Sequence, residues 1–258
     1  MNVPRDTPLQ DCLQPDWPAP PQVQALFTTR SGGVSQAPFD SFNLGAHVGD
    51  EPQAVERNWQ LLEQGLGARP IALQQVHGTQ VLGLTPATAP GQRADACFTT
   101  ASAVACTVMV ADCLPLLLCN RQGTQVAAAH AGWRGLAAGV IEQTLASFAA
   151  DHELLVWLGP CIGPQAFEVG DEVRAAFCQQ QPQAQSCFVP GVSPDKWWAD
   201  LPALARQRLQ ARAATQVYGN DGSAQWCTLT QRSRFFSHRR DAGVLGSTGR
   251  MAACIWLG

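Results

Sequence analysis

Short apolar runs bounded by glycine, proline, asparagine or aspartate recur along this chain and predict a series of buried β-strands. We expect strands at residues 23–29, 71–76, 79–84, 104–110, 114–119, 125–129, 154–158 and 225–229. A tight corner at His77-Gly78 is expected to join the second of these strands to the third. The histidine of this corner is the first candidate for a functional residue.

Apolar positions three and four residues apart predict helices between the strands. The first helix is expected to follow Asp50 as its N-cap, with Gln53 at the third helical position, and to end at Gly67. Its apolar face comprises Val55, Trp59, Leu62 and Leu66. Further helices are expected after the HAGW segment, near residues 171–180 and at residues 200–214. Strands, glycine turns and helices therefore follow one another repeatedly.

Residues 1–22 differ from the rest of the chain because they are rich in proline and show little apolar periodicity. We expect them to form an extended N-terminal arm, either laid on the surface or loose. No linker or sequence repeat divides residues 23–258, which are expected to form one domain. Mixed strands with interleaved helices predict an α/β (α+β) fold, a single layered domain with a mixed β-sheet and flanking helices.

The composition excludes several classes of protein. The chain has 258 residues, 46% of them hydrophobic, which is enough to bury one core and excludes intrinsic disorder. Its formal net charge is −3 at pH 7, so it has no positive surplus for a nucleic-acid backbone or an anionic membrane. We therefore expect neither nucleic acid nor membrane as a partner. Lys196 is the only lysine, so a bound anion is expected to meet arginine.

The ten cysteines lie mostly inside apolar runs, as Cys106 and Cys119 do. The N-terminal segment MNVPRDTPLQ lacks the cationic and apolar regions of a signal peptide, so we expect reduced thiols and a cytoplasmic protein. The apolar stretches are interrupted well before the roughly 18 residues that a membrane-spanning helix needs. The sequence leaves the oligomeric state open.

Three residues with metal-binding side chains lie where predicted strands meet turns: His77, Cys113 and His130. Two imidazoles and one thiolate fill three positions of a tetrahedral Zn²⁺ ion and leave the fourth for water or substrate, as in catalytic sites. Their spacing matches no zinc-finger pattern, so an alternative stays open in which Cys113 is a core residue and both histidines bond to backbone. We assign no role in this site to the remaining histidines, His47, His152 and His238.

Two aspartates and two arginines are further candidates. Asp95 and Asp112 adjoin apolar strands, where an unpaired carboxylate is costly, so we expect each to orient a metal ligand or pair with an arginine. A position in a surface loop is the alternative. Arg30 precedes Gly32-Gly33, and Arg134 lies at a predicted helix N-terminus. Both arginines are expected to bind phosphate, and solvent-facing side chains are the alternative for each.

Short blocks spread along the chain are similar to those of one known family. In order they are FTTRSGGVS (27–35), NLG (43–45), QVHG (75–78), ADA (94–96), ADCLP (111–115), HAGWRG (130–135), GPCIGP (159–164) and FFSHRRD (235–241). Together they make the chain, from about Pro15 onward, resemble the YfiH-type laccase-domain family. Two positions depart from the family pattern, because His238 and Phe39 stand where tyrosine is frequent.

The resemblance implies a cytoplasmic single-domain protein that holds one zinc ion through His77, Cys113 and His130. It also implies a purine nucleoside phosphorylase that acts on inosine, adenosine, guanosine and methylthioadenosine with phosphate, and adenosine deamination as a related activity. Bacterial members are also described as peptidoglycan editing factors, which remove a misplaced serine from a cell-wall precursor. An older polyphenol oxidase label implies copper, but one His-Cys-His set does not supply the several copper centres of a laccase.

The favoured hypothesis is a zinc-dependent purine nucleoside phosphorylase. Phosphorolysis aims an anionic phosphate at the anomeric carbon, and arginines and a metal would supply the electrostatic stabilisation. Deamination instead needs a metal-activated water, which one open zinc position could also serve. An amide hydrolase acting on a muramyl precursor, with Cys113 as nucleophile and His130 as base, is the alternative among enzymes. A protein that binds a nucleotide or cell-wall intermediate without turnover is the third possibility.

Overall fold

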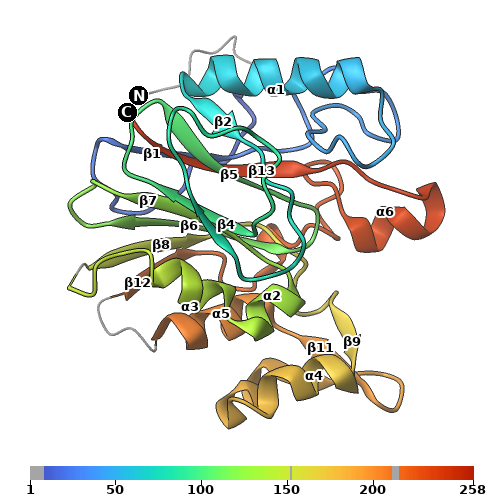
Figure 1. Cartoon of the computed structure of the whole chain (residues 1–258). Coiled ribbons are helices and arrows are strands. Elements are labelled where there is room, and N and C mark those ends of the chain that lie inside the picture. Colours follow the sequence, from blue (N-terminus) through green and yellow to red (C-terminus); the bar gives the residue numbers. More distant parts are fainter. Residues whose placement is uncertain (1–8, 152, 211–214) are drawn as a thin grey trace.

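Two β-sheets stack face to face in this protein, and helices cover both outer sides (Figure 1). The computed structural model describes residues 9–151, 153–210 and 215–258. The four-stranded sheet has the order β1 (Val23–Phe27), β13 (Met251–Leu257), β5 (Val104–Val110) and β2 (Arg69–Ile71). The six-stranded sheet has the order β12 (Thr215–Gly219), β8 (Leu154–Leu158), β6 (Leu114–Asn120), β7 (Val126–Ala131), β4 (Ala96–Thr99) and β3 (Val81–Gly83).

Both of these sheets are mixed. In the six-stranded sheet β6 pairs antiparallel with β7 and β8, whereas β12 runs parallel to β8 and β3 runs parallel to β4. In the four-stranded sheet β13 pairs antiparallel with β1 and β5, and β2 runs parallel to β5. The predicted fold class, a layered α/β domain with mixed β-structure and flanking helices, is confirmed.

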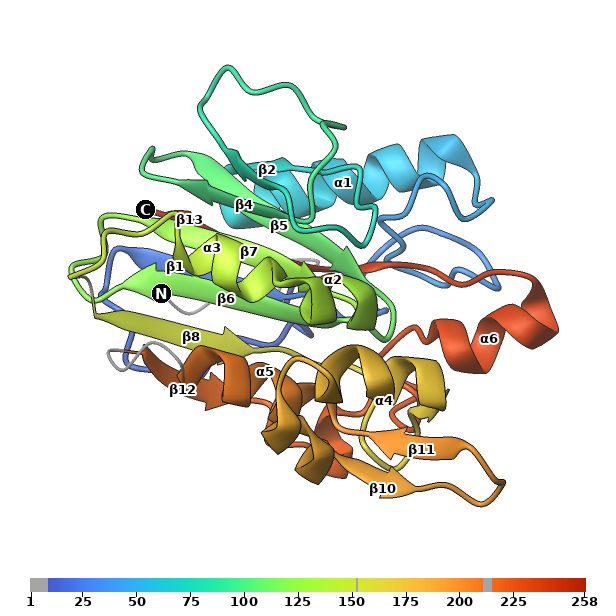
Figure 2. The same ribbon diagram turned by 60° about the horizontal axis from the view of Figure 1, so that its bottom comes forward.

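The helices fall into separate groups. Helix α1 (Pro52–Leu66) covers the four-stranded sheet, and α2 (Trp133–Ala138), α3 (Val140–Leu145) and α5 (Leu201–Gln210) cover the six-stranded sheet. Figure 2 shows a smaller unit beside α5. It consists of β9 (Glu168–Gly170), α4 (Asp171–Cys178), the 3₁₀-helix η1 (Pro182–Cys187), β10 (Phe188–Pro190) and β11 (Lys196–Ala199). The 3₁₀-helix η2 (Ala224–Trp226) and α6 (His238–Leu245) lie between β12 and β13 in the chain. No helix among the described residues is both long and apolar enough to cross a membrane.

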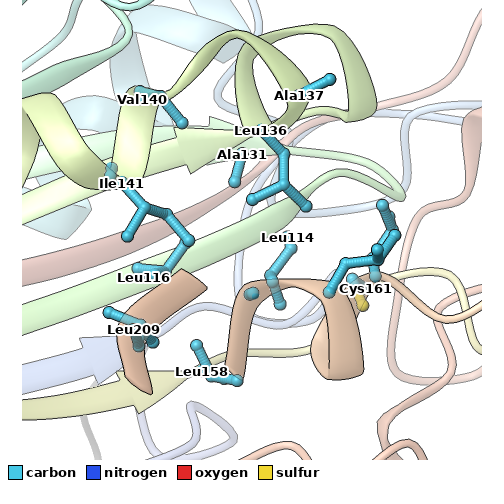
Figure 3. Close-up of a cluster of buried hydrophobic side chains, with 14 of the residues drawn as sticks. Leu114, Leu116, Ala131, Leu136, Ala137, Val140, Ile141, Leu158, Cys161 and Leu209 are labelled. Atoms are coloured by element: carbon cyan, nitrogen blue, oxygen red, sulfur yellow. The ribbon is translucent and has the colours of Figure 1, made fainter. Parts of the chain in front are cut away.

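The central strands are apolar throughout because both of their faces are buried. In β6, Leu114, Leu116 and Leu118 face the helices, whereas Leu117 and Cys119 face the other sheet. Figure 3 shows the helix side of this arrangement, with Leu114 and Leu116 packed near Leu136 and Ile141. Because successive side chains in a strand point to opposite faces, one run of apolar residues fills two layers of core.

Several expectations about the elements were wrong. Asp50 does not cap α1, because its carboxylate binds Asn43 and the backbone N–H of Glu51, and Glu51 is the N-cap residue. The two strands expected on either side of His77 are shorter than predicted, because residues 72–80 lie between them outside any strand. The two strands, β2 and β3, also belong to different sheets. No strand forms at residues 225–229, which contain part of η2. Strands β4, β9, β10, β11, β12 and β13 were not predicted.

The N-terminal arm was predicted for residues 1–22, and residues 1–8 lie outside the described residues. Leu9 is buried against α1, where a Cβ on Gly65 would lie 2.2 Å from its Cδ1 atom. Leu13 forms an isolated bridge with Phe27 of β1. From Leu9 onward the arm is therefore laid on the protein. Of the helix predicted at residues 200–214, residues 211–214 also lie outside the described part.

Candidate metal centre

Neighbouring strands of the six-stranded sheet bring Cys113 and His130 together. Strands β6 and β7 are antiparallel, and Pro115 pairs with His130, so Cys113, directly before β6, lies beside the end of β7. On its other edge β7 pairs with β4, which Asp95 directly precedes. The backbone N–H of His130 donates to the carbonyl oxygen of Asp95 at 2.7 Å. The sheet order β6-β7-β4 thus gathers three residues that are distant in the chain.

The loop before β3 carries His77 to the same place. Strand β3 runs parallel to β4, so the residues that precede the two strands lie at the same end of the sheet. The Asp95 carboxylate accepts backbone N–H groups from Val76, His77 and Gly78 at 3.1, 2.8 and 2.7 Å. His77 has a φ of +58°, a left-handed conformation that lets these consecutive N–H groups converge on one carboxylate. Asp95 therefore shapes the loop that presents His77.

The three predicted ligands form one cluster. One potential ligand atom from each of His77, Cys113 and His130 lies within 4.8 Å of the other two. The Sγ atom of Cys113 is 3.7 Å from Nε2 of His77, and the two imidazole centroids are 4.8 Å apart. The Nδ1 atom of His130 bonds to Oδ1 of Asp95 at 2.9 Å, which leaves its Nε2 atom for a metal. This donor set fits a tetrahedral zinc ion with one open position.

Two glycines after His130 allow this close packing. A Cβ on Gly132 would lie 2.6 Å from Cδ2 of His77 and 3.0 Å from Sγ of Cys113. A Cβ on Gly135 would lie 2.8 Å from the carbonyl oxygen of Gly78. Any larger residue at these positions would push α2 away from the His77 loop. The HAGWRG block therefore supplies both a candidate ligand, His130, and the space around it.

The electrostatics of the cluster favour the thiolate form of Cys113. Burial alone would raise the pKa of this thiol, but the imidazoles of His130 and His77 lower it to about 6. Burial lowers the pKa of His130, whereas Cys113 and Asp95 raise it to about 9. Burial opposes ionisation of Asp95 too, yet hydrogen bonds from His130, Gly78 and Val76 give this carboxyl a lowered pKa. Thiolate is the form of cysteine that binds a metal, so these electrostatics are compatible with a metal site.

A cavity of about 470 Å³ opens onto the cluster. It is lined by His47, Leu73, Gln74, Gln75, His77, Met109, Val110, Ala111, Cys113, His130, His238 and Arg250. Its volume lies within the range of small-molecule sites, about 300–1,000 Å³. Arg250 was not predicted as a site residue, and His47 and His238 were assigned no role, because these residues meet the cluster only through the tertiary fold.

The two arginines predicted to bind phosphate do not line this cavity. Arg30 forms an ion pair with Asp40 at 3.2 Å and donates to the carbonyl oxygen of Arg232 at 3.1 Å. It borders a separate hollow of about 330 Å³. Arg134 is exposed, and its guanidinium lies 4.3 Å from the centroid of the Trp133 ring. The structure thus brings neither arginine into the cavity beside the metal ligands.

Asp112 differs from Asp95 although it directly precedes Cys113. Its carboxylate accepts hydrogen bonds from Thr228 Oγ1 at 2.6 Å, Ser237 Oγ at 3.1 Å and the backbone N–H of Arg239 at 2.6 Å. These contacts hold the start of α6 against the residue before Cys113. Within the described part of the chain, the Asp112 carboxylate contacts neither histidine ligand and forms no ion pair with an arginine.

Known proteins share this fold and much of this sequence. Residues 24–258 match the family model described as multi-copper polyphenol oxidoreductase laccase. A purine nucleoside phosphorylase of Pseudomonas aeruginosa is 54% identical over 246 residues, covering 95% of this chain and 98% of that protein. The purine nucleoside phosphorylase YfiH of Escherichia coli is 51% identical over 248 residues, with coverage of 95% and 98%.

Solved structures agree with these sequence matches. A Neisseria meningitidis protein of 48% identity superposes with a TM-score of 0.88 and covers 96% of this chain and 99% of that one. YlmD from Geobacillus stearothermophilus, at 30% identity, gives a TM-score of 0.80 with coverage of 95% and 96%. This chain therefore belongs to the multi-copper polyphenol oxidoreductase laccase family, together with its YfiH relatives.

Proposed function

We propose that this protein is a purine nucleoside phosphorylase whose His77, Cys113 and His130 hold one zinc ion. The observation that carries the proposal is the convergence of these ligands on one cavity in a chain 51–54% identical to proteins named purine nucleoside phosphorylase. Inosine, adenosine, guanosine and methylthioadenosine are the proposed substrates, with phosphate as the second one. Residues 23–258 would act as one catalytic domain, preceded by the N-terminal arm.

Phosphorolysis replaces the bond between the sugar and the purine by a bond between the sugar and phosphate. The protein must therefore hold a nucleoside and an anion side by side and stabilise the charge that develops as the purine leaves. A cavity with imidazole, thiol and guanidinium groups on its wall offers the donors for this task. A zinc ion, when bound, would supply a Lewis acid for an anionic oxygen.

Each residue of the cluster has a separate proposed role. His77, Cys113 and His130 bind the metal, and Asp95 orients His77 through backbone N–H groups and His130 through its ring. We propose Cys113 as a ligand rather than a nucleophile, because its sulfur forms one set of potential ligand atoms with both imidazoles, all within 4.8 Å of one another. Asp112 positions α6 and with it the wall that carries His238.

Zinc is proposed in place of the copper that the family description names. A laccase reaction requires several copper centres, and the described residues contain one cluster of potential ligands, the His-Cys-His set. A single set with an open position suits a redox-inert Lewis acid. Elemental analysis of freshly purified protein tests the choice directly.

We also propose that the protein works in the cytoplasm on small molecules. Cys106, Cys119 and Cys254 support this location, because they are buried in strands as free thiols, and burial raises the pKa of each. Thiols of this kind serve as small apolar core residues in a reducing compartment.

The decisive experiment combines metal content with product analysis. Wild-type protein is expected to contain one zinc ion per chain and to convert inosine and phosphate to hypoxanthine and ribose 1-phosphate. Cys113→Ala and His77→Ala should lose the metal and reduce turnover more than about 100-fold. This is more than the loss expected when a residue that only hydrogen-bonds to a metal ligand is removed. Cys178→Ala is the matched control, since Cys178 lies on α4, outside the cavity.

Two results would count against the proposal. Full zinc content and full turnover in Cys113→Ala would show that the cluster has no part in the reaction. Zinc without any nucleoside turnover in the wild type would contradict the phosphorylase and favour a different substrate. Adenosine as substrate adds a further distinction, because phosphorolysis releases adenine whereas deamination releases inosine and ammonia.

A further inference from the structure

The cavity beside the metal centre has a second group of polar side chains that are not metal ligands. His47, His238 and Arg250 line it together with the cluster, so four of the five histidines border one space. Among the described residues that line the cavity, none is acidic. When the Cys113 thiolate is bound to the proposed zinc ion, a wall with cationic and N–H donor groups and no carboxylate is suited to an anion.

Arg250 has unused donors at this wall. Its Nη1 atom donates to the carbonyl oxygens of Thr248 and Gly249 at 2.8 and 3.2 Å. Within the described residues, its Nε and Nη2 atoms have no hydrogen-bond partner and its charge forms no ion pair. Burial lowers the pKa of Arg250, although Cys113 and Asp112 oppose this effect. A half-buried guanidinium with free donors is best complemented by an anion.

The NLG block, which has no part in the metal centre, is built around this arginine. Oδ1 of Asn43 accepts the backbone N–H groups of Arg250 and Gly45 at 2.8 and 2.9 Å. The backbone N–H of Leu44 donates to the carbonyl oxygen of Arg250 at 3.1 Å. A Cβ on Gly45 would lie 2.7 Å from Cγ of Arg250, so glycine leaves room for the arginine stem. The same loop continues to His47.

We propose that Arg250, flanked by His47 and His238, is the subsite that holds orthophosphate next to the metal centre. This inference rests on the proposed function, in which phosphate is the nucleophile. One oxygen of hydrogen phosphate forms a bond to the anomeric carbon while the bond from that carbon to the purine nitrogen breaks. The electron pair of the broken bond leaves with the purine, which takes up the proton that hydrogen phosphate gives up.

This subsite replaces the one expected from the sequence. Arg30 has a carboxylate partner in Asp40 and borders a different hollow, and Arg134 is exposed on α2. Arg250 alone of the three lines the cavity that contains the ligands. A phosphate held there would share one space with a nucleoside near the cluster.

The test compares Arg250→Met and Arg250→Lys with Arg57→Met, a control on the exposed surface of α1. Calorimetry of the zinc-loaded proteins with inorganic phosphate measures binding directly. Loss of charge-assisted hydrogen bonds in Arg250→Met should weaken phosphate binding about 10- to 100-fold. The KM for phosphate should rise by a similar factor, whereas zinc content and the KM for inosine stay near the wild-type values.

Arg250→Lys retains the charge without the forked donors, so its phosphate affinity should lie between those of the wild type and Arg250→Met. This variant also serves as the test if Arg250→Met does not fold. Unchanged phosphate affinity in either folded variant would overturn the subsite, as would a raised KM for phosphate in Arg134→Met alone. Arg57→Met should match the wild type.

The outcomes separate the subsite from the proposed function. If the wild type converts inosine and the Arg250 variants keep its KM for phosphate, the subsite fails and the phosphorylase stands. If the wild type binds phosphate through Arg250 but converts no nucleoside, the phosphorylase fails. The anion subsite then stands and belongs to a different anionic substrate.

Discussion

Asp95 and Asp112 are both buried carboxylates beside the ends of central strands, yet they hold different parts of the molecule. The Asp95 side chain binds the backbone around His77 and the ring of His130, so both of its partners belong to the proposed metal centre. The Asp112 side chain binds Thr228, Ser237 and the backbone of Arg239, none of which belongs to the cluster.

This difference shows that burial and position beside a strand identify a structural carboxylate but not its role. Both aspartates avoid the cost of an unpaired buried charge by accepting several hydrogen bonds. Only the identity of the donors decides whether the carboxylate serves the metal or the wall of the cavity. We therefore expect Asp95→Asn and Asp112→Asn to affect different properties, zinc binding in the first variant and stability in the second.

Asp95→Asn should give the largest effect. An amide has one acceptor oxygen, and its NH₂ group would face N–H donors from the His77 loop or the ring of His130. We expect zinc affinity to fall about 10- to 100-fold. The free energy of unfolding should fall by about 3 kcal/mol or more, as for a broken buried ion pair. Competition with a zinc chelator and urea unfolding measure these effects, and an unchanged zinc affinity would refute the role of Asp95.

Gly132→Ala is expected to weaken the same corner without removing a hydrogen bond. The added methyl group would collide with His77 and with the sulfur of Cys113, so zinc content and turnover should both fall. The matched control is Gly243→Ala in α6, where a Cβ meets nothing within 4 Å and should stabilise the helix by about 0.5–1 kcal/mol. Equal zinc content in the two variants would contradict the crowding that we infer.

Asp112→Asn should act on stability rather than on the metal. Asp112 has a φ of +86°, which asparagine tolerates, so the backbone should be retained. The lost charge at the start of α6 and the weakened hydrogen bonds should cost about 1–3 kcal/mol. Thermal unfolding measures the loss, while elemental analysis should find the full amount of zinc. Loss of zinc from the Asp112→Asn variant would contradict the difference in role that we infer between Asp112 and Asp95.

The smallest difference should appear in the chemistry of the Cys113 thiol. In metal-depleted wild-type protein we expect iodoacetamide labelling of Cys113 to fall as the pH drops through about 6, because the lowered pKa keeps the thiolate above that pH. Asp95→Asn removes the anion that helps keep His130 protonated, so the midpoint should rise, whereas Asp112→Asn should leave it unchanged. Mass spectrometry of labelled Cys113 measures the extent of labelling at each pH. A wild-type midpoint near 9.0, the ordinary value for a cysteine thiol, would contradict the lowered pKa.

The sequence predicted most, but not all, of the strands whose two faces are buried. The runs at 104–110, 114–119 and 154–158 correspond to β5, β6 and β8, because a strand buried on both sides must be apolar at every position. The run at 251–257 carries the same signal and could have been predicted. Strands β9, β10 and β11 were not predicted because they are short and partly exposed, and their pairing comes from the tertiary structure.

The sequence predicted those residues of the site that have a local sequence signal of their own. Cys113 and His130 stand at strand ends, His77 stands in the loop before β3, and all three match the family blocks. The structure brings them together. Arg250 was missed because it meets the cluster only after β13 has joined the sheet. The predicted roles of Arg30 and Arg134 rested on nearby glycines and a helix start, which do not show which cavity an arginine faces.

The place of β13 in its sheet has a consequence for how the protein is made. This strand lies between β1 and β5, so neither of those strands can complete its backbone pairing until the ribosome has released residues 251–257. Until then, a nascent chain exposes apolar strand edges of the kind that chaperones shield. Arg250 directly precedes β13 and is therefore synthesised just before it. A chain that stops before residue 250 would therefore have neither a closed sheet nor the anion-holding side of its cavity.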